Sequence, residues 1–202
     1  MMGRVQTTTR TAGRKREPRT DAAAVEAVLD LVNAGATLSG LSLVMIAEHA
    51  GVSRNSLYRR WKTKDELYLD VLDAINKPLP EFDGPTARDD LSAHLEILIE
   101  RTLDQRASSM LRALLAEAAA FPELHRRYFE EIVAPRRDVM YRIIGRGIAS
   151  GEIRPDVDVA FVNDMLVGPI LARMGQGATR GLDPGKTSRQ ITDFAFDGIG
   201  AR

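Results

Sequence analysis

Residues 42–67 read SLVMIAEHAGVSRNSLYRRWKTKDEL, a stretch that predicts two short helices around a tight turn and the start of a third helix. Ser42 is a good N-cap residue, and Leu43 and Ile46 follow it at the spacing of one buried helical stripe. Gly51 stands where the first helix must end with a positive φ angle. The stretch therefore predicts a helix, a glycine corner and a second helix.

The second predicted helix has one apolar side and several polar sides. Ser53 can cap its start, and Leu57 and Trp61 lie four residues apart, as expected of side chains that enter a core. The remaining positions are polar. This pattern predicts a helix-turn-helix whose second helix offers polar side chains to a DNA major groove.

The charge around this helix supports the prediction. Five basic residues lie in the stretch from Arg54 to Lys64, and no acidic residue occurs there before Asp65. DNA affinity depends mainly on neutralised phosphates, which a compact cationic surface provides. The alternative interpretation is a solvated basic helix packed on Trp61, but it does not explain why the caps and the corner occur together with the charge. The candidate DNA-binding residues are Ser42, Ser53, Arg54, Asn55, Ser56, Tyr58, Arg59, Arg60 and Lys64.

The run IAEHAGVSRNSLYRRWKTKDEL resembles the DNA-binding signature of the TetR family of bacterial transcriptional regulators. The likeness extends from about Leu41 to Leu72, and the C-terminal half is similar to the family's helical regulatory half. The resemblance implies that Tyr58 and Lys64 meet phosphates and that Asn55 and Ser56 approach bases. It also implies a homodimer on a palindromic operator, usually a repressor, with a small-molecule effector in the C-terminal half.

Composition is that of an ordinary globular protein, with 44% hydrophobic and 28% charged residues in 202. The formal net charge is zero, but residues 1–77 hold 12 Lys and Arg against 9 Asp and Glu, which leaves residues 78–202 acidic by the same excess. A basic head on an acidic body fits a protein that binds DNA at one end. There is no cysteine, no membrane-length apolar run and no secretory signal, so the cytoplasm is the expected compartment.

Helical periodicity runs through almost the whole chain and predicts an all-α fold. We expect a basic flexible arm at 1–20, a DNA-binding domain of three helices and a fourth behind them at 21–77, and a C-terminal ligand-binding and dimerisation domain at 78–202. The arm is rich in Arg and nearly free of apolar residues, so it is either a solubilising tail or an arm that lies along DNA. Further helices are predicted at 87–106, 110–120, 122–133, 135–150, 157–174 and 187–198.

The C-terminal half supplies methionine, leucine and aromatic side chains that suit a ligand cavity, although for each residue taken alone plain core packing is the favoured interpretation. The candidate pocket residues are Leu111, Leu114, Phe121, Phe129, Met140 and Met165. The last two predicted helices are apolar on more than the one face that packing against their own chain requires. This predicts a dimer interface in which both helices pack against their symmetry mates as a four-helix bundle, unless a single chain buries both faces. The candidate interface residues are Phe161, Met165, Ile170, Met174, Ile191 and Phe194.

No catalytic set is visible, so we expect neither an enzyme nor a cofactor. Asp90 and His94 have a spacing that can share a metal, but no second His or Cys lies nearby, which favours a surface Asp–His pair. The leading hypothesis is a ligand-responsive repressor. The alternative is a DNA-binding regulator without a small-molecule effector, controlled by a protein partner or by abundance. An enzyme with an appended DNA-binding head ranks last.

Overall fold

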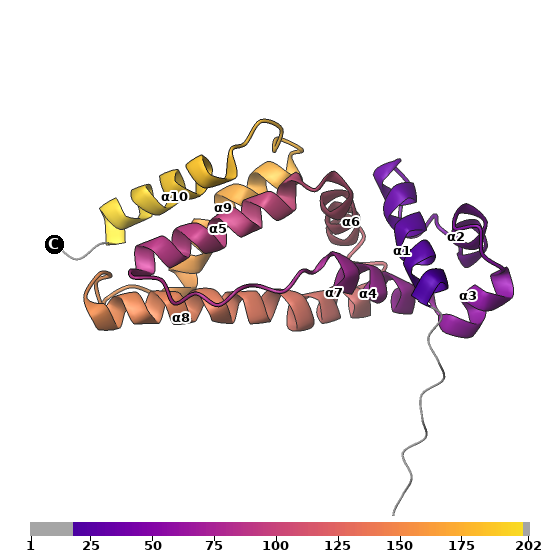
Figure 1. Cartoon of the computed structure of the whole chain (residues 1–202), viewed down its shortest axis with the longest axis horizontal. Coiled ribbons are helices and arrows are strands. Elements are labelled where there is room, and N and C mark those ends of the chain that lie inside the picture. The colour runs from indigo at the N-terminus through magenta and orange to yellow at the C-terminus, as the bar shows by residue number, and fades with distance from the viewer. Residues whose placement is uncertain (1–17, 200–202) are drawn as a thin grey trace, which may run out of the picture.

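A computed structural model describes residues 18–199 and confirms the predicted all-α fold (Figure 1). A head at one end is formed by α1 (Pro18–Asn33), α2 (Leu43–His49), α3 (Arg54–Arg60) and α4 (Lys64–Ile75). The body follows with α5 (Ala87–Leu103), α6 (Gln105–Ala116), α7 (Pro122–Tyr128), the π-helix η1 (Phe129–Val133), α8 (Ala134–Ser150), α9 (Val159–Gly175) and α10 (Pro184–Ile199). None of the helices in this described part of the chain is both long and apolar enough to cross a membrane.

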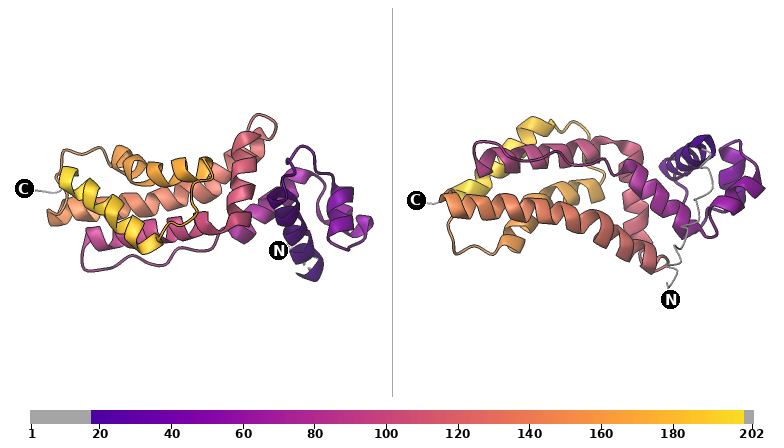
Figure 2. Two further views of the ribbon diagram at one scale, coloured as in Figure 1. Left: turned by 90° about the horizontal axis from the view of Figure 1, so that it is seen from above. Right: turned by 60° about the horizontal axis from the view of Figure 1, so that its bottom comes forward.

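Two hydrophobic cores hold the chain together, and they do not divide at the predicted boundary of residues 77 and 78. The first core joins the head to α6 and α7, and Met110, Leu114 and Phe121 pack there with side chains of α1 and α4. The second lies among α5, α8, α9 and α10. Figure 2 shows α6 and α7 between the head and the long helices of the body. The position of the head is therefore fixed by packing as well as by the linker.

The linker of residues 76–86 runs from α4 back along α5 and α8 to the start of α5 (Figure 1). Arg146 of α8 holds it by donating to the backbone carbonyl of Phe82 (3.1 Å). Arg101 of α5 donates to the carbonyls of Lys77 and Pro78. The linker is thus bound to the body along its length.

Some predicted helix bounds need correction. The first helix begins at Pro18, so residues 18–20 belong to it, whereas residues 1–17 of the predicted arm lie outside the described part. The predicted helix 87–106 is broken at Asp104, whose carboxylate accepts hydrogen bonds from the N–H groups of Arg106 and Ala107 (both 3.1 Å). A capping side chain of this kind starts a new helix without glycine or proline.

Pro135 does not open a separate helix as predicted. The chain stays helical from Pro122 to Ser150, because the π-helix η1 lies directly before the proline. The backbone N–H of Ala134 donates to the carbonyl of Phe129, five residues earlier. Pro135 has no backbone N–H of its own, and in a regular helix its ring would crowd the carbonyl four residues earlier. The wider π turn before it accommodates the proline.

Candidate DNA-binding site

The helix-turn-helix forms as predicted, because its capping residues lie where α2 and α3 begin. The side chain of Ser42 accepts a hydrogen bond from the backbone N–H of Met45 (3.2 Å), and Ser53 accepts one from that of Ser56 (3.1 Å). Such caps satisfy donors that a helix start leaves unpaired. Gly51 has a φ of 65°, a conformation that glycine adopts without strain. These features set the angle between α2 and α3.

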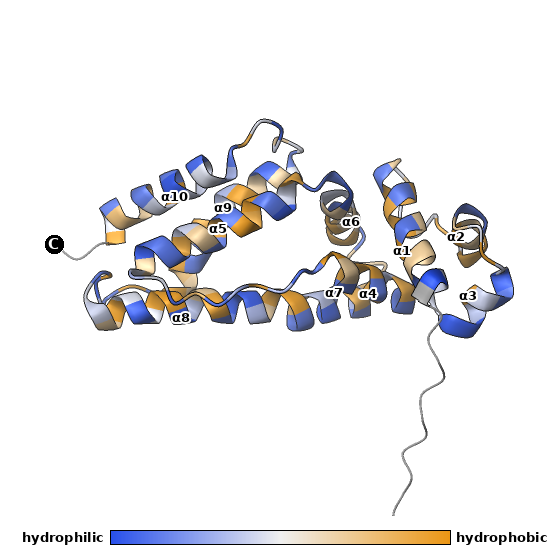
Figure 3. Ribbon diagram, viewed as in Figure 1, coloured by the Kyte–Doolittle hydropathy of each residue, from blue (hydrophilic) through white to orange (hydrophobic). Residues whose placement is uncertain are grey.

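Helix α3 places its apolar residues inward and its polar residues outward. Leu57 is fully buried, and Trp61 at the end of the helix is only 2% exposed. Asn55, Tyr58 and Arg59 lie on the exposed faces. Figure 3 shows α3 as a mostly hydrophilic helix at the far end of the molecule. An exposed polar helix after a tight turn is the element that enters the major groove in helix-turn-helix proteins.

Two of the candidate arginines make ion pairs within the head. Arg54 pairs with Glu48 of α2, and both side chains are exposed. Arg60 donates to Asp21 of α1 (3.0 Å), and its guanidinium lies 5.5 Å from the centre of the Trp61 ring. An exposed pair contributes only about 0–1 kcal/mol, so DNA phosphates can compete for Arg54. Arg60 is held by both an acid and a ring, and we interpret it as a residue that ties α3 to α1.

Lys64 has a structural role that the sequence analysis did not predict. Its ammonium group donates hydrogen bonds to the backbone carbonyls of Leu38 (3.1 Å), Ser39 (3.0 Å) and Leu41 (2.9 Å). The hydroxyl of Tyr68 also donates to the carbonyl of Leu38 (2.8 Å). These bonds hold the loop between α1 and α2. A phosphate contact by Lys64 must share the same three hydrogens, and it stays a prediction.

A carboxylate of the body completes this clamp on the loop. Glu117, the C-cap residue of α6, accepts hydrogen bonds from the backbone N–H groups of Leu38 (2.6 Å) and Ser39 (2.9 Å). Partial burial alone would raise the pKa of Glu117, but the hydrogen bonds from Ser39 and Leu38 and the charge of Lys64 hold that pKa below its usual value. Because 79 residues separate Glu117 from Leu38, no local sequence pattern predicts the contact.

The capped recognition helix, its outward polar face and its apolar underside together define a DNA-binding protein of the helix-turn-helix class. Two family matches identify the group within that class. Residues 38–71 match the bacterial regulatory proteins of the tetR family, and residues 82–190 match the tetracyclin repressor-like C-terminal domain. The second match alone spans more than half of the chain. The chain belongs to the TetR family of transcriptional regulators.

Individual relatives agree with this assignment. The HTH-type transcriptional regulator YdeS of Bacillus subtilis is 28% identical over 163 residues, which are 80% of this chain and 81% of that protein. Among solved structures, NalD of Pseudomonas aeruginosa aligns over 92% of this chain and 98% of its own with a TM-score of 0.73 and 19% identity. FadR of Bacillus subtilis, crystallised with stearoyl-CoA, aligns over 91% of this chain and 100% of its own with a TM-score of 0.69 and 18% identity. These two structures support the fold alone.

The candidate pocket residues do not line one cavity, and that prediction is corrected. They divide between the two cores and the surface, because α6 and α7 turn toward the head. Leu111, Leu114 and Phe121 pack in the core shared with the head, Met140 lies in the body core, and Phe129 and Met165 are exposed.

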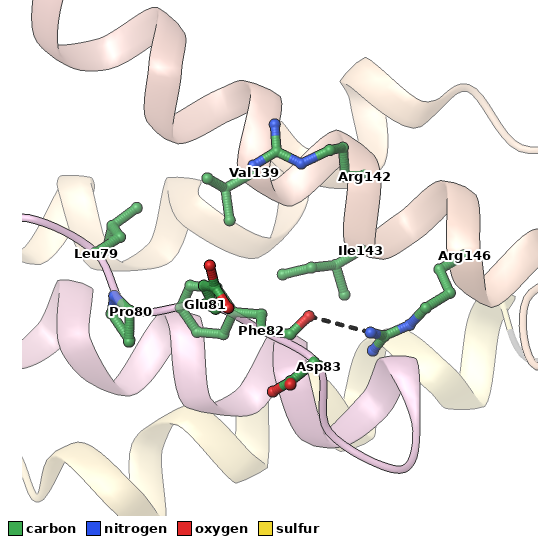
Figure 4. A pocket seen from close by; sticks show the side chains of 9 residues that line it. All are labelled: Leu79, Pro80, Glu81, Phe82, Asp83, Val139, Arg142, Ile143 and Arg146. Carbon is green, nitrogen blue, oxygen red and sulfur yellow. Dashed lines mark hydrogen bonds between the residues drawn. The ribbon is translucent and has the colours of Figure 1, made fainter.

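A different set of residues lines an open pocket of about 530 Å³ between the linker and α8 (Figure 4). It is partly apolar, since Val139 and Ile143 of α8 face Phe82 across it. The full lining is Leu79, Pro80, Glu81, Phe82, Asp83, Val139, Arg142, Ile143 and Arg146. Sequence reasoning missed this pocket because the linker was expected to connect domains only.

The candidate dimer residues fall into a buried group and an exposed group. Ile170 and Met174 are 2% and 3% exposed, so they are buried within their own chain and the prediction for them is corrected. Ile191 is partly buried against the body core. The other three are large apolar side chains on the outer surface of α9 and α10: Phe161 (63% exposed), Met165 (44%) and Phe194 (77%).

Asp90 and His94 are both buried, whereas the sequence predicted a surface pair. Asp90 accepts a hydrogen bond from the backbone N–H of Gly84 (3.1 Å) and pairs with Arg146. The ring of His94 lies 5.3 Å from that of Phe82. Within residues 18–199, no group of three or more His, Cys, Asp or Glu side chains could hold a metal ion.

Proposed function

We propose that this protein is a homodimeric repressor that binds a palindromic operator through α3 of each subunit and leaves it when a small molecule binds the body. The observation that carries the proposal is the outward face of α3, where Asn55, Tyr58 and Arg59 surround a buried Leu57. Ser56 and Arg54 lie beside them, and the exposed Arg54–Glu48 pair can open toward phosphate.

The apolar surface of α9 and α10 supports a dimer. Phe161, Met165 and Phe194 are exposed, together with Leu171 (43%) on the same helix as the first two. Large apolar side chains that gather on an outer surface are typical of a protein–protein interface. A two-fold axis through these helices would set two recognition helices about 34 Å apart or somewhat more, the spacing of successive major grooves.

The experiment is selection of bound duplexes from a random DNA pool with the full-length protein. We expect an inverted repeat whose half-sites lie about one helical turn apart. A selected site without two-fold symmetry would contradict the dimeric proposal. For the basic arm, whose residues 1–17 lie outside the described part, we propose added affinity without added specificity.

The alternative is a DNA-binding regulator that a protein partner or abundance controls. One observation favours it, namely that the candidate pocket residues do not converge on a cavity. The pocket beside Phe82 favours the ligand-responsive function instead. A ligand that binds the body and changes operator affinity would decide between the two.

A further inference from the structure

A buried histidine lies beside the linker without a hydrogen-bond partner. His94 of α5 is only 4% exposed, and neither ring nitrogen, Nδ1 or Nε2, meets a donor or acceptor of the described protein. Buried polar groups have a hydrogen-bond partner in the large majority of cases, so a buried imidazole without one is unusual. Its ring packs against Phe82, which also lines the pocket between the linker and α8.

Two arginines lie close enough to His94 to affect its charge. Burial, together with the charges of Arg101 and Arg136, lowers the pKa of His94 to about 4, so the ring is neutral at pH 7. A neutral imidazole can donate through one nitrogen and accept through the other. The three side chains come from two helices, α5 and α8.

Both arginines lack a counterion among residues 18–199. Arg101 donates only to the carbonyls of Lys77 and Pro78, and Arg136 donates to the side-chain oxygen of Asn76. The Nε atom of Arg136 is buried without a partner. Burial lowers the pKa of each guanidinium, and for Arg101 the neighbouring charge of Arg136 lowers it further. Two partly buried cations without a neighbouring acid favour the binding of an anion.

We propose that His94, Arg101 and Arg136 bind the oxyanion head group, a carboxylate or a phosphate monoester, of a small organic ligand whose apolar part occupies the pocket beside Phe82. Guanidinium groups bind either oxyanion through paired N–H donors. Val139 lies one helical turn after Arg136 on α8, and it lines that pocket with Ile143. Phe82 lines the pocket and also packs against His94, so its ring connects the pocket with the proposed head-group site.

The same arginines connect this site to the head. Asn76, the partner of Arg136, is the C-cap residue of α4, and the linker carbonyls bound by Arg101 follow directly. An anion that draws the guanidinium groups toward itself weakens these bonds and changes how α4 is held. This consequence rests on the proposed release from the operator, whereas binding of the anion does not.

The test uses full-length protein without DNA at pH 7, with isothermal titration of hexanoate, hexyl phosphate, benzoate and phenyl phosphate. Hexanol is the uncharged control for the two hexyl-chain anions, benzyl alcohol for benzoate and phenol for phenyl phosphate. We expect saturable binding of at least one anion, about tenfold or more tighter than the alcohol of the same skeleton. The two head groups in each pair identify which oxyanion the site prefers. If none of the four anions binds, or if the alcohols bind equally well, the proposal is wrong.

Variants locate the bound anion. Arg136→Gln and Arg101→Gln should each weaken binding about tenfold or more. Arg137→Gln is the matched control, since Arg137 follows Arg136 on α8, pairs with Asp164 and does not line the pocket, and it should keep wild-type affinity. Equal affinity in Arg136→Gln and the wild type would overturn the proposal, as would loss only in Arg137→Gln. If an arginine variant fails to fold, the NMR signal of His94 in the wild type is the second measurement. Binding that leaves this signal unmoved also overturns the proposal.

Operator affinity is measured separately with saturating anion. A fall in affinity supports the coupling through Asn76. Unchanged operator affinity with normal anion binding would leave the site in place and refute release by this ligand, so the failures of the two proposals can be told apart.

Discussion

Glu117 of α6 accepts a 2.6 Å hydrogen bond from the backbone N–H of Leu38, and through it the body holds the loop that leads into α2. The bond joins residues from opposite sides of the interface between head and body. On the other side of the loop, Lys64 binds the carbonyls of the same backbone. The entry to the helix-turn-helix is therefore fixed by a carboxylate and an ammonium group from two different elements.

Glu117→Gln should destabilise the protein by about 1–2 kcal/mol at pH 7, because hydrogen bonds to a charged acceptor are stronger than those to an amide. Since the folded protein holds the pKa of Glu117 below its usual value near 4.5, this contribution is present above pH 4.5 and is lost as the pH falls through the folded pKa. Urea unfolding of both proteins between pH 7 and pH 3 measures the difference. A constant difference across that range would contradict the charged hydrogen bond.

Lys64→Met should lower stability by about 1–3 kcal/mol, because it leaves the carbonyls of Ser39 and Leu41 without this donor and removes one of the two donors to the carbonyl of Leu38. Lys62→Met is the matched control, since Lys62 is exposed and uses only its backbone N–H, which donates to Glu66. Thermal and urea unfolding give the two values. Equal stability of the variants would show that the clamp contributes nothing. In folded Lys64→Met protein, a salt dependence of operator binding that falls by about one unit of slope would confirm the predicted phosphate contact.

Tyr58→Ala should weaken binding to operator and random DNA alike, by about tenfold, if its hydroxyl meets a phosphate as proposed. Because 48% of Tyr58 is exposed, stability should change by no more than about 0.5 kcal/mol. Tyr58→Phe, which removes only the hydroxyl, is the control for loss of the ring. Fluorescence anisotropy with a labelled duplex checks both, and unchanged affinity in folded Tyr58→Ala would remove Tyr58 from the site.

Phe161→Glu and Phe194→Glu should give monomers, because each places a charge in the proposed interface of α9 and α10. Operator affinity should fall by about 10²–10⁴, since two heads would no longer bind as one unit. The control is Leu115→Glu, which changes a similarly exposed apolar residue (42%) on α6. Analytical ultracentrifugation at micromolar concentration measures the state of each. A monomeric wild type would refute the interface.

Gly147→Ala should destabilise the protein by about 1–3 kcal/mol through overpacking. A Cβ at this position would lie 2.7 Å from Cδ1 of Ile153 and 2.8 Å from Cβ of Ala87. Gly145→Ala, two residues earlier on α8, meets nothing within 4 Å and should gain about 0.5–1 kcal/mol from helix propensity. Calorimetry of the pair tests the close approach of α8 to α5. A neutral Gly147→Ala would show that the neighbours move at little cost.

Local features of the head could be predicted from sequence because their causes are local. Ser42, Ser53 and Gly51 act within three or four residues, and the structure confirms each of them. The broken helix at Asp104 was missed although its signal was present, since an aspartate before a new helical run is also a good N-cap. Pro135 is a local signal for a distorted helix, but a proline can equally begin a new helix, so the sequence did not distinguish the π turn from a helix start.

Contacts between distant segments could not be predicted. Ile170 and Met174 look like interface residues in the sequence, because an apolar helix face gives no sign of whether its own chain or a partner covers it. His94 carries no signal of burial beside two arginines that come from different parts of α5 and α8. Such arrangements arise from packing angles between helices, and the spacing of residues along one helix does not determine those angles.

Because α1 and α4 share their core with α6 and α7, the head is not an exchangeable module. A chimaera joined at residue 77 would remove the side chains that cover Met110, Leu114 and Phe121. The exposed apolar surface would promote aggregation. New operator preferences can therefore arise by replacing outward residues of α3, while wholesale exchange of heads between relatives requires matching changes in α6 and α7. Replacement of a whole head is thus coupled to the packing of α6 and α7, whereas changes on the outward face of α3 are not.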